Sequence, residues 1–176
     1  MDLTAPLSLP CPLTPADVES VARGRRRVEL SPQGRRHLSE VRSRLERRIA
    51  AGDPMYRINT GFGSLSQMRV DADGLRQMQQ NLVRSHSSGV GEALPPDVVR
   101  AMMLTHAASL SRGASGVRPE VVEILLRLLE AGITPVVPAR GSVGASGGLA
   151  PLSHLALALM GDRRSIYAGD AEPTGP

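Results

Sequence analysis

A run of small residues from Gly141 to Gly148 has a composition and spacing that could perform chemistry. It reads Gly-Ser-Val-Gly-Ala-Ser-Gly-Gly and precedes an apolar stretch, Leu149 to Met160, that predicts a buried helix. A phosphate loop would need Gly-Lys-Ser/Thr after its glycines, and a dinucleotide loop would need the spacing Gly-x-Gly-x-x-Gly. The run has neither feature, so we do not expect it to bind phosphate.

Ser146 could instead be a nucleophile, because Gly144-Ala-Ser-Gly-Gly148 matches the Gly-x-Ser-x-Gly turn that precedes a helix in serine hydrolases. In that fold an acidic residue and then a histidine follow the serine along the chain. The one histidine after Ser146 is His154, which lies within the very next predicted helix. The sequence therefore disfavours a serine hydrolase.

Ala145, Ser146 and Gly147 also form a tripeptide that can react with its own backbone. The amide nitrogen of Gly147 can attack the carbonyl carbon of Ala145 and close a five-membered ring, which requires unhindered residues on both sides. Loss of water, with elimination of the Ser146 hydroxyl, leaves an exocyclic methylidene group that is a strong electrophile. The positive end of the following helix dipole would favour addition of electron-rich partners. A plain flexible loop is the alternative that three small residues leave open.

The composition argues against several other kinds of chemistry. All 21 basic residues among the 176 are arginine, which excludes a Schiff-base lysine and a P-loop lysine. The single cysteine, Cys11, cannot form an internal disulfide or a Cys-x-x-Cys metal site, so we expect no metal and a reducing, cytoplasmic location. The N-terminus does not resemble a secretory signal, and the apolar run at 149–160 is too short to span a membrane.

Nucleic-acid binding is also disfavoured. Aromatic residues make up 2% of the chain, too few for a base-stacking surface. Arginines cluster before residue 49, but glutamates are interspersed among them, and Arg42 and Glu46 have the i,i+4 spacing of a helix surface pair. We therefore interpret the arginine cluster as a solvated helix face.

The elements that must position the reactive run are predicted to be mainly α-helices. Capping residues or prolines mark the helix starts, and apolar residues follow at helical spacing. The predicted helices cover residues 14–24, 31–51, 75–84, 95–111, 119–131 and 149–160, the loops cover 55–63, 85–91 and 141–148, and residues 136–138 are compatible with a short strand. At about 150 residues per domain, this pattern indicates one mainly α domain with glycine-rich loops.

Four blocks of the sequence resemble the histidine and phenylalanine ammonia-lyase family in order and spacing. They are Gly141-Ser-Val-Gly-Ala-Ser-Gly-Gly-Leu-Ala-Pro-Leu-Ser-His154, Tyr56-Arg-Ile-Asn-Thr-Gly-Phe-Gly63, Asn81-Leu-Val-Arg-Ser-His-Ser-Ser-Gly-Val-Gly-Glu92 and Ser111-Arg-Gly-Ala-Ser-Gly-Val-Arg118. The blocks lie between residues 56 and 154, and the resemblance extends over nearly all of residues 12–162. The resemblance implies the N-terminal region of the family's helical-bundle fold, with glycine-rich active-site loops and minor short strands.

The resemblance implies a role for five residues. Ala145, Ser146 and Gly147 would form the family's methylidene-imidazolone electrophile autocatalytically. Tyr56 would be the catalytic acid/base, since a tyrosine whose pKa is lowered by positive surroundings can remove a weakly acidic β-proton, and His86 would lie in the substrate pocket. The serine before His86 is more like the histidine-specific members. We therefore expect elimination of ammonia from L-histidine to give urocanate, with phenylalanine or tyrosine ammonia-lyase and aminomutase as alternatives.

Two departures from the family pattern bear on activity. Gly148 stands where the family has an aspartate, whose carboxylate would orient the loop and assist proton transfers during ring closure. Arg57 replaces the glycine that follows the catalytic tyrosine and adds bulk and charge beside Tyr56. A truncated noncatalytic remnant, or a subunit that needs a partner chain, is therefore the alternative to an active lyase.

The remaining histidines are expected to have other roles. His37 and His106 are predicted to be structural or surface residues. His154 matches a position of the family motif, and we expect it to serve helix packing.

The length predicts that the chain lacks the family's C-terminal helical bundle. We divide it into a flexible N-terminus at 1–11, a lyase N-terminal domain at 12–162 and a disordered tail at 163–176. The resemblance implies a small amino-acid substrate and active sites shared between subunits of a homotetramer. Apolar helices at 121–129 and 149–160 would lack part of their cover, so we expect a homo-oligomer or a complementing C-terminal chain.

Overall fold

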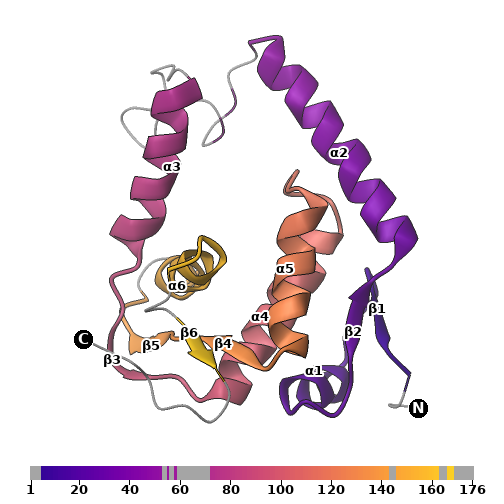
Figure 1. Ribbon diagram of the computed structural model, residues 1–176, viewed down its shortest axis with the longest axis vertical. Helices are drawn as coiled ribbons and strands as arrows, with labels where there is room; N and C mark the ends of the chain where they lie inside the picture. Colours follow the sequence, from indigo (N-terminus) through magenta and orange to yellow (C-terminus); the bar gives the residue numbers. More distant parts are fainter. Residues whose placement is uncertain are drawn as a thin grey trace.

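The computed structural model describes residues 5–52, 55, 58, 72–142, 146–162 and 166–168. These residues form mainly α-helices, as predicted. The helices are α1 (Pro15–Ala22), α2 (Pro32–Ala50), α3 (Ala72–His86), α4 (Pro96–Ser111), α5 (Pro119–Glu130) and α6 (Leu149–Leu159). Figure 1 shows α4 and α5 in the middle of the molecule, with α2 and α3 on opposite sides of them. Each predicted helix is confirmed to within about three residues at either end.

The N-terminal residues form a strand where the sequence predicted a flexible segment at 1–11. β1 (Leu7–Leu9) pairs in parallel with β2 (Val28–Leu30). Leu7 and Leu9 are buried and the residue between them is exposed. Because successive side chains of a strand point to opposite faces, both leucines enter the core. The expectation of flexibility is therefore wrong for the described part of this segment that forms β1.

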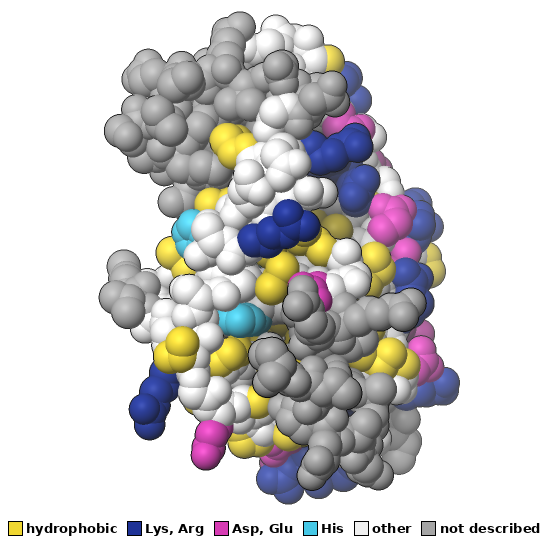
Figure 2. Space-filling model, turned by 60° about the vertical axis from the view of Figure 1, so that its left-hand side comes forward, with side chains coloured by type: hydrophobic (Ala, Val, Ile, Leu, Met, Phe, Trp, Pro, Cys, Tyr) yellow, Lys and Arg dark blue, Asp and Glu magenta, His cyan; other side chains and the backbone are white. Residues whose placement is uncertain are grey.

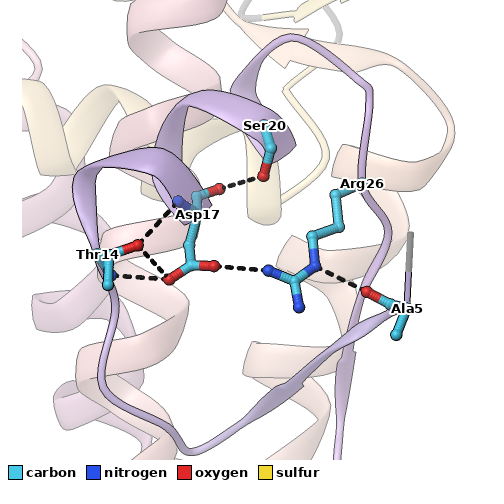
Figure 3. Close-up of polar contacts among 5 residues, drawn as sticks. All are labelled: Ala5, Thr14, Asp17, Ser20 and Arg26. Atoms are coloured by element: carbon cyan, nitrogen blue, oxygen red, sulfur yellow. Dashed lines mark hydrogen bonds and ion pairs between the residues drawn. The ribbon is translucent and has the colours of Figure 1, made fainter. Parts of the chain in front are cut away.

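α1 begins at the predicted position because Thr14 and Asp17 form a capping box. The Thr14 hydroxyl donates to Asp17 Oδ2 (2.6 Å), and the Asp17 amide donates to Thr14 Oγ1 (3.2 Å). Arg26 Nη1 donates to Asp17 Oδ1 (2.6 Å), and Arg26 Nε donates to the carbonyl of Ala5 (2.7 Å), as Figure 3 shows. The Asp17 side chain is 2% exposed, so this ion pair is buried and joins the start of α1 to the chain segments around β1 and β2.

The core lies where α1 and α5 pack against α4. Its completely buried residues include Val99, Met103, Leu104, Val122 and Leu125. The sequence predicted that the helix at 121–129 would lack part of its cover, and the structure shows that one face of α5 is buried while Val121, Ile124 and Leu128 are half-buried. Its apolar side chains recur on one face, and α4 covers that face within this chain.

Arg100 joins three helices at the edge of this core. From α4, its guanidinium donates to the carbonyl oxygens of Val21 and Ala22 at the end of α1 and of Leu129 at the end of α5. The last carbonyls of a helix carry partial negative charge, so a cation stabilises both helix ends.

Two further strand pairs connect distant segments. β3 (Val90–Ala93) pairs antiparallel with β5 (Pro138–Arg140), and β4 (Ile133–Pro135) pairs antiparallel with β6 (Ile166–Ala168). The strand suggested at 136–138 is misplaced, because residues 136 and 137 separate β4 from β5. β6 falls in the segment predicted as a disordered tail, and β3 begins within the predicted loop at 85–91. Such short strands obtain their hydrogen bonds from distant partners, which local patterns do not encode.

α6 is apolar except for Ser153 and His154, and much of it is uncovered. It buries Ala150 and Leu155, whereas Leu149 and Leu152 expose 50% and 39% of their surface. Figure 2 shows hydrophobic side chains and histidines together on the side of the molecule that carries α3 and α6. The expected lack of cover is confirmed for this helix. Among the helices in the described ranges, none combines the length and apolarity needed to cross a membrane.

Candidate functional site

Ser146, Gly147 and Gly148 form the turn that leads into α6. Gly147 has a φ of +63°, a left-handed conformation that glycine adopts without strain. The Gly148 amide donates to Ser146 Oγ at 3.4 Å, and Ser146 is exposed. Within the described residues, a Cβ placed on Gly147 would meet only Ser142 Oγ, at 3.6 Å. Among the described residues, no atom therefore crowds the Gly147 side of the tripeptide.

This turn borders an open groove of about 390 Å³ between α4 and α6. Its lining residues are Met102, Thr105, His106 and Ser109 from α4, and Gly147, Gly148, Pro151 and Leu152 from the turn and α6. His106 was predicted to be a structural or surface residue, and the structure places it half-buried in this wall. Burial lowers the pKa of its imidazole, which favours the neutral ring at pH 7.

His86 is the last residue of α3 and is half-buried. Its Nδ1 lies 2.9 Å from the carbonyl oxygen of Leu82 and 3.1 Å from Ser85 Oγ. A carbonyl oxygen can only accept a hydrogen bond, so Nδ1 carries a hydrogen, and in the neutral form of the ring Nε2 keeps its lone pair. The helix thereby orients the ring and leaves Nε2 able to accept a hydrogen bond from a ligand.

The pairing of β3 with β5 brings the segment after His86 to the segment before α6. The first residue pair of these two strands is Val90 and Arg140. In an antiparallel pair the residues just outside it, Gly89 and Gly141, therefore face each other. A Cβ placed on Gly141 would lie 2.8 Å from the Cα of Gly89, and the φ of Gly141 is +124°. A side chain at Gly141 would therefore push the two loops apart. The two glycine-rich loops that the sequence singled out separately are in contact.

His154 makes a second link between these segments. The Gly89 amide donates to His154 Nε2 at 3.1 Å. The expectation of helix packing did not identify this partner. The sequence offered one hint of this contact, because Gly89 and His154 both lie in blocks that carry the family resemblance. Neither block indicates that the two residues form a hydrogen bond with each other.

The structure therefore places three of the five predicted site residues. Ser146 and Gly147 lie at the start of α6, His86 lies at the end of α3, and these helices pack against each other. Tyr56 and Ala145 lie outside the described residues. Across the described ranges, histidine, cysteine and carboxylate side chains do not gather in threes in a way that could hold a metal ion.

Comparison with known proteins gives consistent matches. The family model for aromatic amino acid lyases matches residues 13–175. Histidine ammonia-lyase of Deinococcus radiodurans is 50% identical over 154 residues, which are 88% of this chain and 29% of that protein. Tyrosine ammonia-lyase of Cupriavidus metallidurans is 47% identical over 163 residues, which are 92% of this chain and 31% of that protein. The chain thus spans about a third of the length of the curated relatives that it matches.

A solved structure agrees with these relatives. Tyrosine aminomutase from Streptomyces globisporus superposes with a TM-score of 0.86 at 35% identity, covering 97% of this chain and 32% of that protein. The matched residues include the end of α3, the β3 and β5 pair and the turn before α6. Sequence and architecture agree over nearly the whole chain, and the chain belongs to the aromatic amino acid lyase family.

Proposed function

We propose that this chain is the N-terminal part of an ammonia-lyase that converts L-histidine to urocanate. The observation that carries the proposal is the contact between the His86 segment and the segment that leads to Ser146 and Gly147, in a chain of this family. Its relatives include both histidine and tyrosine ammonia-lyases. The choice of histidine rests on the serine and histidine pair at the end of α3.

Ala145, Ser146 and Gly147 are the residues that would form the methylidene-imidazolone group. That group supplies an electrophile that makes the amine of an amino acid a better leaving group. The described residues fit its formation, because Gly147 is unhindered and adopts a left-handed turn. Gly148 adds no bulk beside them.

The chain's own side chains would bind the substrate and move its proton. Nε2 of a neutral His86 ring is an acceptor and can bind an N–H of the substrate, while the Leu82 carbonyl keeps the hydrogen of that ring on Nδ1. Tyr56 is the proposed base that takes the β-proton, and elimination is complete when that proton and the amine have both left.

A C-terminal chain segment is the proposed partner that completes the site. The relatives are about three times as long as this chain, and α6 exposes apolar residues next to the candidate turn. A covering segment would remove Leu149 and Leu152 from water. In sedimentation at micromolar concentration we expect the isolated chain to self-associate through such surface, and a monomer would contradict that expectation.

The first test is the intact mass of the purified chain. A deficit of two water molecules that maps to Ala145-Ser146-Gly147 would show ring closure, and Ser146→Ala should abolish it. Gly148→Asp should increase the dehydrated fraction, and Gly148→Asn is the matched neutral control. Among the described residues there is room for the Cβ of either side chain, which would make ordinary contacts with Leu152 Cδ1 at 3.5 Å and Ser146 Oγ at 3.8 Å. Full mass in the wild-type and Gly148→Asp chains, even with a C-terminal part present, would refute the electrophile.

A noncatalytic remnant is the second candidate, and Gly148 is the observation that favours it. Mixing the chain with the C-terminal part of a histidine ammonia-lyase should produce urocanate absorbance if the first proposal is correct. A stable, well-folded complex without turnover would support the remnant instead.

A further inference from the structure

We propose that His154 is a positioning residue of this site, which holds the segment carrying His86 against α6 through the Gly89 amide. This inference rests on the proposed function and extends it to a residue outside the reacting set. His154 acts through the backbone of Gly89 and does not itself touch the tripeptide in this account.

The geometry fixes the direction of the hydrogen bond. A backbone N–H can only donate, so His154 Nε2, 3.1 Å from the Gly89 nitrogen, must be the acceptor. His154 is therefore neutral, with its hydrogen on Nδ1. Burial also lowers the pKa of His154, which favours this neutral form at pH 7.

Gly89 is held in a close-fitting place. A Cβ at this position would lie 2.8 Å from His154 Nε2 and 3.0 Å from the Cβ of Pro138. The Gly89 backbone therefore touches both α6 and β5, and a side chain there would break the contact. The hydrogen bond holds the Gly89 amide nitrogen against His154 Nε2 in a fixed direction. Apolar packing alone would not impose that direction.

The chain from His86 to Gly89 has little freedom to absorb a shift. The Ser87 amide donates to the carbonyl of Val83 and its hydroxyl donates to the same oxygen, so Ser87 is fixed to the end of α3. Only Ser88 separates that anchor from Gly89. Releasing Gly89 from α6 would therefore move the end of α3, and His86 with it, relative to the turn before α6.

Two nearly isosteric variants of the full chain test the contact. Glutamine in His154→Gln offers an amide oxygen at a reach similar to Nε2, whereas methionine in His154→Met has the same length without a strong acceptor. We expect the Gly89 amide to exchange with solvent about tenfold faster in His154→Met and to remain protected in His154→Gln. The Leu94 amide, which donates to Val137 at the other end of the β3 and β5 pair, is the internal reference and should not change.

The positioning role is tested by the His86 ring and by kinetics. The ring signals of His86 should shift in the NMR spectrum of His154→Met and stay near the wild-type positions in His154→Gln. With the C-terminal part of a histidine ammonia-lyase, His154→Met should raise KM for L-histidine by about fivefold with kcat nearly unchanged, and His154→Gln should restore KM. A general loss of folding would instead lower the apparent kcat and leave KM unchanged.

The outcomes separate this inference from the proposed function. Unchanged exchange of Gly89 or unchanged His86 signals in His154→Met would overturn the positioning role. A wild-type chain that loses two waters and turns over, with equal KM in all three proteins, would overturn it as well and leave the lyase intact. A wild-type chain that never loses water would refute the proposed electrophile, while the NMR comparison would still decide the contact.

Discussion

α5 and α6 are both rich in leucine, yet the fold buries the apolar residues of α5 to a much greater extent than those of α6. α5 buries Val122, Leu125 and Leu129 and turns Arg127 to solvent. α6 has no charged residue between Leu149 and Leu159 and leaves several of its leucines at least partly exposed. The one-sided apolar face of α5 is thus covered within this chain, whereas the more continuous apolar surface of α6 is only partly covered by it.

The same contrast divides the molecule into two regions. The closed region contains α1, α4 and α5 and most of the buried residues. The open region contains α3 and α6, the groove beside the turn before α6, and the described site residues. The part of the fold that carries the candidate chemistry is therefore the less buried part of the described structure.

The largest expected effect compares the same substitution in both regions. Leu125→Ala removes a completely buried side chain from α5 and should lower the free energy of unfolding by about 3 kcal/mol. Leu152→Ala on α6 removes a side chain that is 39% exposed and should cost less than about 1 kcal/mol. Urea unfolding of the two variants measures both values. Equal losses would show that α6 is as well covered as α5.

The next largest effect concerns the buried ion pair of the closed region. Asp17→Asn leaves the Arg26 guanidinium without its carboxylate and should lower the urea midpoint at pH 7. Hydrogen bonds from Thr14 and the charge of Arg26 hold the pKa of Asp17 below its ordinary value of 3.8. Burial of the carboxyl acts in the opposite direction and is outweighed. The stabilisation is therefore complete above that ordinary value and is lost as the pH falls through the lowered pKa in the folded state.

A matched surface variant provides the control for Asp17. Glu19 pairs with Arg23 and Arg25 but is 53% exposed, so Glu19→Gln should change the midpoint little at any pH. Unfolding at pH 7 and at pH 2 distinguishes the two cases. A difference between wild type and Asp17→Asn that persists at pH 2 would assign the loss to packing and not to charge.

A smaller effect is expected from the two histidines next to α6. Burial lowers the pKa of His106 and of His154 below the ordinary value of 6.5. The unfolded chain therefore takes up protons before the folded chain does, and stability should fall as the pH drops from 7.5 to 5.5. His106→Gln should remove part of this dependence in urea unfolding at the two pH values. An unchanged midpoint in the wild-type chain would mean that the open region is more hydrated than its geometry indicates.

The smallest effect is expected on the surface of α2. Arg42 Nε donates to Glu46 Oε1 at 2.7 Å, which confirms the predicted pair, and the two side chains are 32% and 55% exposed. Exposed pairs of this kind contribute little, so Glu46→Gln should change the free energy of unfolding by no more than about 0.5 kcal/mol. Urea unfolding in low and high salt measures this change in the free energy of unfolding. A larger loss would show that the Arg42–Glu46 pair is shielded from solvent as the pair of Asp17 and Arg26 is.

Local sequence predicted the helices because their signals are local. Thr14 and Ser31 accept hydrogen bonds from the first turns of their helices, and apolar spacing marks the faces of α4 and α5. The family resemblance, and with it the reactive tripeptide, also depended on residues adjacent in sequence. Membership of the family is confirmed over residues 13–175, and the reaction of the tripeptide stays a prediction. The strand at Leu7–Leu9 was missed because its partner begins at Val28.

The sequence by itself determined which segments are helical and which family the chain belongs to, and it supplied the prediction of a reactive tripeptide, because helix caps, apolar periodicity and motif order all depend on residues close together in the chain. Only the tertiary structure decided that Gly89 meets Gly141 and His154, and that α5 is covered while α6 is not. The strand pair and the hydrogen bond that bring Gly89 to these partners join residues 50 and 65 positions apart in the chain, and contacts so distant in sequence are not encoded by local patterns.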